Sequence, residues 1–295
     1  MVAPLSFSTS DERYVDFIDQ VGGERYQSCR TTLEEFQKGV LAAKSQILPQ
    51  IKGNYTTLGS ASVALEHAVF EAAFAFWQYG TPESPAAGCA KIPPASATPN
   101  KLLEFLETVN SVEGSYSDAG LERFVSYYVQ AAQQLGSPSA KLTHLSDVSE
   151  HQDTYRVESY IPRETSREFD GTVMPEIQSW VQGDSKRIMF IYGEYDPWTA
   201  GKYTPGSLEN DNYLYVAPKG NHGSNVDSLS SADRAKAWDT IRRWLELPTE
   251  IAAAVTAATG GTAQDEILVD QTPKLESLEE LEFRLLRKNR TAALK

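Results

Sequence analysis

Apolar residues recur at helical spacing through the first half of the chain, which predicts a block of helices. Over about residues 32–49 they lie three or four positions apart. The segment 60–79 is rich in alanine and aromatic residues and apolar on most faces, so we expect a buried helix there. Two more helices are predicted over about 100–112 and 118–135, and the polar stretch 138–170 is predicted to be an extended connection.

Short apolar runs that stop at turns follow in the second half, and these predict strands. One run stops at a turn that carries Asp196, and the next, Tyr213–Pro218, stops at a turn that carries His222. The first run is apolar on both faces, as expected of a strand inside a parallel sheet covered by helices. With a further strand predicted at Val2–Phe7 and an amphipathic helix over 235–247, the order of elements predicts an α/β fold.

The composition narrows the classes of partner. The chain of 295 residues has a formal net charge of -13, which argues against nucleic acid and anionic membranes as partners. No run approaches the roughly 18 apolar residues of a membrane span, and the N-terminal residues lack the basic region and long apolar stretch of a signal peptide. Cys29 and Cys89 permit either one disulfide or two buried thiols, and neither lies at zinc-ligand spacing.

The chain changes character beyond Pro248. Residues 252–263 are mainly alanine, threonine and glycine, a low-complexity composition. Residues 275–286 carry acidic side chains first and basic side chains last, the order that a helix dipole favours. The segment 248–295 is therefore predicted to be a solvated tail or a terminal helix that packs on the body or on another chain.

Asp196 and His222 are the candidate catalytic residues. A carboxylate and a histidine at the ends of successive strands are two members of a hydrolytic triad, because the carboxylate can orient and stabilise the imidazole. Functional groups in parallel sheets lie at the carboxyl ends of the strands, where Asp196 falls. Taken singly, Asp196-Pro197 is also typical of a plain turn and His222 of a structural loop histidine. Their order, with a strand between them, favours the triad.

The run Tyr192-Gly-Glu-Tyr-Asp-Pro-Trp198, followed by Gly220-Asn-His-Gly223 and a helix ending Arg242-Arg-Trp244, resembles the bacterial secreted tripeptidyl aminopeptidases. These are serine peptidases of α/β-hydrolase fold, and the resemblance covers about residues 2–247. It implies that the chain is the C-terminal half of such an enzyme, with Asp196 as the triad acid and His222 as the general base. It also implies secretion, and an activity that needs no metal or organic cofactor.

The resemblance also implies a division into segments. Residues 1–30 would be a strand and loop of the hydrolase core, 31–170 a helical cap, 171–247 the C-terminal core carrying acid and base, and 248–295 the tail. The family's sheet normally has eight strands, of which this chain would supply the last three. The remaining part would have to come from outside the chain, for instance from a separate N-terminal polypeptide.

The nucleophilic serine is the missing member of the predicted triad. In the family it lies on a Gly-x-Ser-x-Gly elbow upstream of the segment that matches Val2-Ala-Pro-Leu-Ser, so the elbow would precede Met1. No Gly-x-Ser-x-Gly occurs in the chain. The serines near single glycines do not follow a strand and open a helix, as the elbow requires; they are Ser60, Ser62, Ser115 and Ser224.

The predicted substrate is a peptide with a free N-terminus, whose amine a carboxylate would select. Because Glu194 lies two residues before Asp196, it is a candidate ligand for that amine. The alternative is that Glu194 is a supporting residue near the site or forms a salt bridge at the end of the strand. Trp198 is a candidate substrate contact or packs beneath the acid loop. The aromatic residues of the 60–79 segment could line the pocket, although core packing is the commoner role. A binding module without catalysis and an esterase of the same fold are the alternative functions.

Overall fold

A helical block and a small parallel sheet make up the part of the chain that the computed structural model describes, residues 10–80, 82–84 and 88–246. The predicted strand at Val2–Phe7 and the predicted tail 248–295 lie outside these residues. The chain divides into two units, Met1–Trp244 and Leu245–Lys295, and nearly all of the described residues belong to the first. Within the described residues no helix is both long and apolar enough to cross a membrane.

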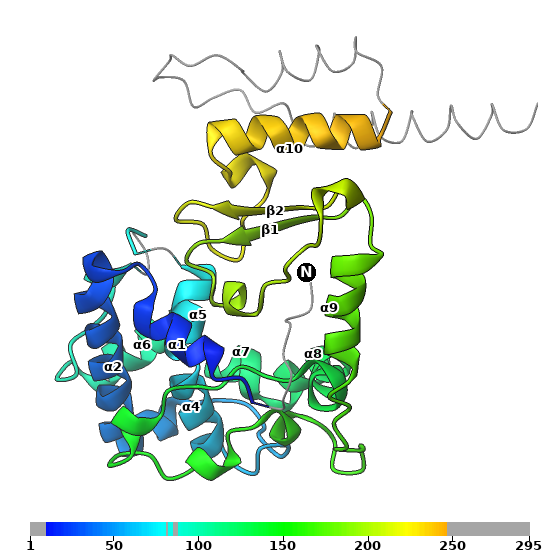
Figure 1. Ribbon diagram of the computed structural model, residues 1–295. Coiled ribbons are helices and arrows are strands. Elements are labelled where there is room, and N and C mark those ends of the chain that lie inside the picture. Colours follow the sequence, from blue (N-terminus) through cyan, green and yellow to red (C-terminus); the bar gives the residue numbers. More distant parts are fainter. Residues whose placement is uncertain (1–9, 81, 85–87, 247–295) are drawn as a thin grey trace, which may run out of the picture. The chain divides into compact units, whose positions relative to one another are not determined.

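The secondary structure follows the predicted order (Figure 1). The α-helices are α1 (Arg13–Gln20), α2 (Gln27–Ala42), α3 (Lys44–Ile47), α4 (Ala61–Phe70), α5 (Ala72–Tyr79), α6 (Pro99–Val109), α7 (Val112–Tyr116), α8 (Asp118–Gln130), α9 (Val173–Gly183) and α10 (Ser231–Trp244). The strands are β1 (Met189–Gly193) and β2 (Tyr213–Ala217). The connection 138–170 contains three short 3-10 turns and, among its residues, no α-helix.

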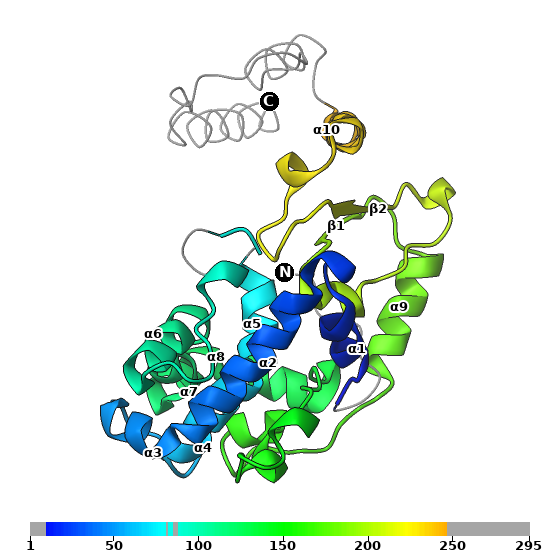
Figure 2. The ribbon, with the colours of Figure 1, turned by 90° about the vertical axis from the view of Figure 1, so that its left-hand side faces the viewer.

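The predicted helix over 60–79 is divided in two at Glu71. Ser60 caps α4 by accepting a hydrogen bond from the amide of Val63, and α5 begins directly after Glu71. Every residue from Val63 to Phe70 is buried, as expected of a helix that is apolar on most faces. The helices α2, α4, α5 and α6 enclose the main hydrophobic core, and Figure 2 shows α2 running the length of this block.

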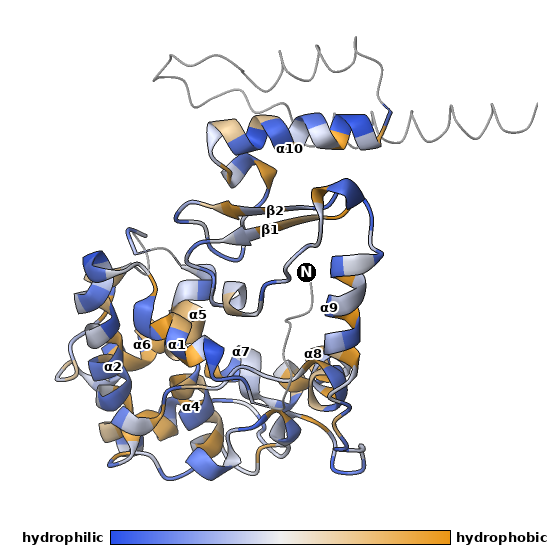
Figure 3. Cartoon of the chain, in the orientation of Figure 1, coloured by the Kyte–Doolittle hydropathy of each residue, from blue (hydrophilic) through white to orange (hydrophobic). Residues whose placement is uncertain are grey.

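The two strands pair in parallel, with Met189 opposite Tyr213 and Gly193 opposite Ala217. Because side chains alternate along a strand, the sheet has two apolar faces. Met189 and Ile191 pack with residues of α10, whereas Phe190 and Tyr192 pack with residues of α9. Both faces are thus partly covered by helices, and the predicted α/β class is confirmed. Figure 3 shows that most residues of α10 are hydrophilic, and its buried Ala237 belongs to the same apolar cluster as Met189 and Ile191.

Candidate active site

The acid loop begins where β1 ends. Asp196 lies three residues beyond Gly193 and caps the 3-10 turn Pro197–Gly201, because its Oδ1 accepts a hydrogen bond from the amide of Trp198 at 3.1 Å. Proline at the first position of this turn has no amide hydrogen to satisfy, which suits a turn start. The Asp196 residue is only 4% exposed. The hydrogen bond to the Trp198 amide therefore fixes the orientation of the carboxylate independently of its contact with His222.

The base loop begins where β2 ends and is held by α5. The amide of His222 donates to the carbonyl of Gln78 at 2.9 Å. Beside it, the side-chain amide of Asn221 donates to the carbonyls of Tyr79 and Gly80 at 2.9 and 3.2 Å. These bonds satisfy carbonyl groups that the end of a helix leaves without intrahelical partners. The position of His222 thus depends on the C-terminal end of α5.

The two loops are in direct contact at Gly193. The amides of Glu194 and Tyr195 donate to the carbonyls of Ala217 and Gly220 at 3.0 and 2.8 Å. A Cβ atom at Gly193 would lie 2.5 Å from the carbonyl oxygens of Gly220 and Asn221. Glycine is therefore needed here so that the acid loop and the base loop can approach each other.

Asp196 and His222 form a hydrogen-bonded pair. The distance from Nδ1 of His222 to Oδ2 of Asp196 is 2.8 Å. When Nδ1 carries the proton that this bond requires, Nε2 has a lone pair available to accept another proton. No described residue hydrogen-bonds to Nε2. Two aromatic rings lie near the imidazole, with centroid distances of 6.0 Å to Tyr79 and 6.3 Å to Trp198.

Glu194 lies on the same loop but has a different environment. Its side chain accepts a hydrogen bond from the amide of Lys219 at 2.6 Å, and this bond stabilises the start of the base loop. It is exposed and borders a cavity formed with residues of α1, among them Arg13 and Gln20. The structure therefore places Glu194 beside the predicted pair without directing it into a pocket shared with His222.

Trp198, unlike Glu194, contacts the ring of His222. Its ring packs edge-on against Tyr14 and Phe74, with centroid distances of 5.8 and 5.2 Å. Its buried Nε1 has no hydrogen-bond partner among the described residues. The tryptophan borders a cavity of about 140 Å³ that residues of α5 and α8 also line.

That cavity contains a carboxylate that sequence reasoning missed. Glu71 lines it together with Gln78, Trp198 and four tyrosines, Tyr127, Tyr128, Tyr155 and Tyr160. The space is roughly ten times the 10–15 Å³ that one water molecule needs. One indication of this carboxylate was present in the sequence, because Glu71 is a single glutamate within the apolar run Val69–Phe74. Its position in the sequence did not show that its side chain would line a cavity.

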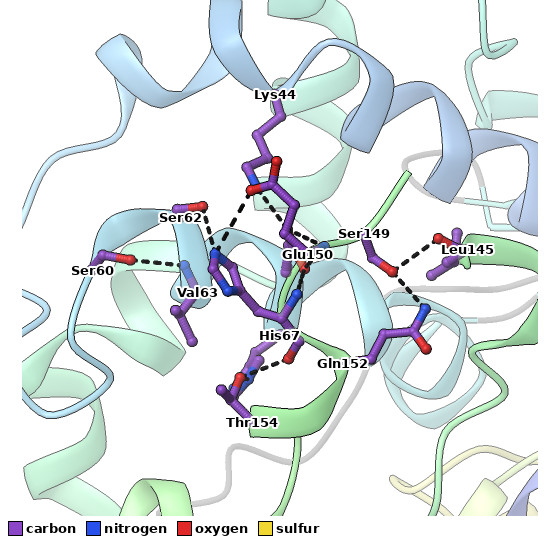
Figure 4. Close-up of polar contacts among 12 residues, drawn as sticks. Lys44, Ser60, Ser62, Val63, His67, Leu145, Ser149, Glu150, Gln152 and Thr154 are labelled. Atoms are coloured by element: carbon purple, nitrogen blue, oxygen red, sulfur yellow. Dashed lines mark hydrogen bonds and ion pairs between the residues drawn. The ribbon is translucent and has the colours of Figure 1, made fainter. Parts of the chain in front are cut away.

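A second polar cluster lies in the helical block (Figure 4). The buried Glu66 carboxylate accepts hydrogen bonds from Lys44 Nζ at 2.6 Å and from the amides of Glu150 and His151. His151 also contacts Ser62, with 3.1 Å between Nε2 and Oγ. Ser62 lies in the first turn of α4 and does not follow a strand, so it lacks the geometry of a nucleophile elbow.

The same cluster offers three oxygen and nitrogen atoms at metal-ligand separation, from Glu66, Glu150 and His151. The ammonium group of Lys44 already lies 2.6 Å from both glutamates. Because that charge offsets part of the negative charge of the two carboxylates, the cluster is better described as a partly buried ion-pair cluster than as a metal centre.

The two cysteines are joined in the structure. Cys29 of α2 and Cys89, in the turn Cys89–Lys91, form a disulfide with 5.3 Å between their Cα atoms. Of the two arrangements that the sequence permits, the structure has the disulfide.

A carboxylate–imidazole pair at the ends of parallel strands is typical of hydrolases, and comparison with known proteins identifies the class as a peptidase. The chain belongs to the PS-10 peptidase S37 family, whose model matches residues 2–276. It is 33% identical over 243 residues to a protein of Streptomyces mobaraensis named prolyl tri/tetrapeptidyl aminopeptidase. The predicted family is thereby confirmed.

The match covers 79% of this chain and 49% of the relative, so the chain spans about half the length of the curated relative that it matches. No solved structure is significantly similar.

Proposed function

We propose that this chain carries the acid and the base of a serine-type peptidase of α/β-hydrolase fold, which releases short peptides from free N-termini. The observation that carries the proposal is the 2.8 Å contact between Asp196 and His222 at the carboxyl ends of two adjacent parallel strands. The name of the Streptomyces mobaraensis relative supports the substrate class.

In the proposed mechanism each member of the pair has one task. Asp196 holds the Nδ1 proton of His222 and stabilises the imidazolium that forms during the reaction. Nε2 of His222 takes the proton of a serine hydroxyl as its oxygen attacks the substrate carbonyl, and returns that proton to the leaving amine. The buried position of Asp196 fits this role, because low solvent access strengthens its interaction with a charged imidazole.

The serine itself is proposed to come from outside these 295 residues, on a separate or additional segment that completes the sheet. Supporting this, the sequence contains no Gly-x-Ser-x-Gly. We also propose that residues 31–170 form a cap over the site and that 171–247 belong to the hydrolase core. The contact between α5 of the proposed cap and the base loop supports this division.

Labelling with a fluorophosphonate probe, read by intact mass, tests the proposal. The chain alone should remain unlabelled, and co-expression with the unmatched part of the Streptomyces mobaraensis relative should restore labelling on a serine of that part. In the restored complex, His222→Ala should abolish the labelling. Stoichiometric labelling of the chain alone would contradict the external nucleophile, and peptide mapping would then name the serine. Labelling that survives His222→Ala would overturn the assignment of the base.

A further inference from the structure

Glu71 is a carboxylate without a cationic partner. Within the described part of the chain, no lysine, arginine or histidine lies within ion-pair distance of it. The two cations that border the neighbouring small cavity on its other side are engaged elsewhere. Lys141 pairs with Asp19 and Glu34 at 3.0 Å, and Arg30 donates to backbone carbonyls.

The surroundings of Glu71 hold its oxygens in place. Tyr116 donates to Oε2 at 2.7 Å and Tyr160 to Oε1 at 3.2 Å, and Tyr155 is a third hydrogen-bond partner. Burial raises the pKa of the Glu71 carboxyl, and these hydroxyl donors oppose that effect. Glu71 is partly buried, and a carboxylate that is partly desolvated and not paired with a cation costs free energy, some of which an incoming cation would recover.

The cavity beside Glu71 has the lining that an ammonium group requires. Aromatic rings of Phe74, Tyr128 and Trp198 border it, and aromatic faces attract cations through their quadrupoles. An ammonium has three hydrogen-bond donors and no acceptor, so it suits a site built from a carboxylate and phenolic oxygens.

The same cavity adjoins the acid–base pair. Trp198 contributes to its wall and also contacts the ring of His222 at 6.3 Å between centroids. Gln78 contributes another part of the wall, and its carbonyl accepts the hydrogen bond from the amide of His222. A ligand in the cavity would therefore lie against two residues that contact His222.

We propose that Glu71 binds the α-ammonium group of the peptide substrate and that the cavity bordered by Gln78, Tyr128 and Trp198 receives its N-terminal residues. This inference rests on the proposed function, because it assigns the binding site of the substrate for that reaction. It replaces Glu194 with Glu71 as the carboxylate that selects a free N-terminus.

Calorimetry on the full 295-residue chain tests the proposal without requiring turnover. The probes are Ala-Ala-Pro amide with a free amine and the same peptide with an acetylated N-terminus. The unaltered chain should bind the free amine about tenfold or more tightly than the acetylated peptide, as expected for a charge-assisted bond. Glu71→Gln keeps an acceptor for the tyrosines but removes the charge, so it should lose this preference. Glu71→Asp should retain part of it.

A matched variant controls for net charge. Glu122→Gln changes an exposed carboxylate on α8 and should leave the preference intact. Failure of the catalytic proposal would be seen separately, because fluorophosphonate labelling reports the nucleophile and the base and not the binding of the ammonium group. The proposal is overturned if folded Glu71→Gln still discriminates between the two peptides, or if the unaltered chain binds both equally.

Discussion

At the scale of single residues, the position of the Nδ1 proton of His222 is the property on which the proposed reaction depends. Asp196→Asn retains the shape of the side chain but can donate a hydrogen bond to Nδ1, which would favour the wrong tautomer. In the labelled complex described above, we expect the rate of fluorophosphonate labelling to fall about 10⁴-fold. The folded state should be unchanged by circular dichroism. A rate within tenfold of the original would contradict the role of Asp196.

His67 provides a residue-scale prediction about stability and pH. Burial, with a smaller contribution from His151, lowers the pKa of His67 to about 3. The unfolded chain takes up a proton near pH 6.5, whereas the folded chain does not. The contribution of neutral His67 to stability is therefore complete above pH 6.5 and is lost as the pH falls from 6.5 toward 3.

His67→Asn removes this titration, which urea unfolding can measure. Between pH 7 and pH 5, the free energy of unfolding of the unaltered chain should fall by about 2 kcal/mol more than that of the variant. Equal pH dependence of the two proteins would show that His67 takes up its proton in the folded state as well.

At the scale of elements, the contact between the acid and base loops leaves no room for a side chain at residue 193. Gly193→Ala should move the loops apart, lower the free energy of unfolding by about 1–3 kcal/mol, and reduce labelling of the complex. Gly183→Ala is the matched control, because a Cβ atom there would meet nothing within 4 Å. Equal effects of the two substitutions would mean that the close approach at Gly193 has no energetic consequence.

The sequence predicted most helices and strands but not the contacts between residues that are far apart in the chain. Spacing of apolar residues located helices in the segments 32–49, 60–79, 100–112, 118–135 and 235–247, and short apolar runs located both described strands, since burial imposes these patterns directly. Helix α1 was not predicted. The division of the 60–79 segment at Glu71 could not be predicted, because its apolar pattern continues on both sides. The turns that carry Asp196 and His222 were recognisable from the sequence. Glu71 was not, since its role depends on tyrosines more than 40 positions away in the chain.

At the scale of the whole molecule, the disulfide closes a long loop around the helical block. Cys29 and Cys89 are separated by 60 residues, so the link restricts the unfolded chain considerably. The chain-entropy treatment gives about 4 kcal/mol for a loop of this length. The double variant Cys29→Ser/Cys89→Ser should lose about this free energy of unfolding in urea.

The reduced form of the unaltered chain is the control for that measurement. It should unfold at the same urea concentration as the double variant, because both lack only the cross-link. If reduction leaves the unfolding midpoint unchanged, the disulfide does not contribute to stability.

The attachment of the base loop to α5 has a consequence for the length of peptide that the proposed site would accept. Glu71 immediately precedes this helix, and Gln78, which holds His222 through its carbonyl, is seven positions further along. At 1.5 Å per residue, the helix separates the two ends by about 10 Å. An extended peptide covers about that distance with three residues. The length of α5 would thus determine where a substrate is cleaved. One end of the helix would fix the first residue of the substrate, and the other end would fix which peptide bond reaches the histidine.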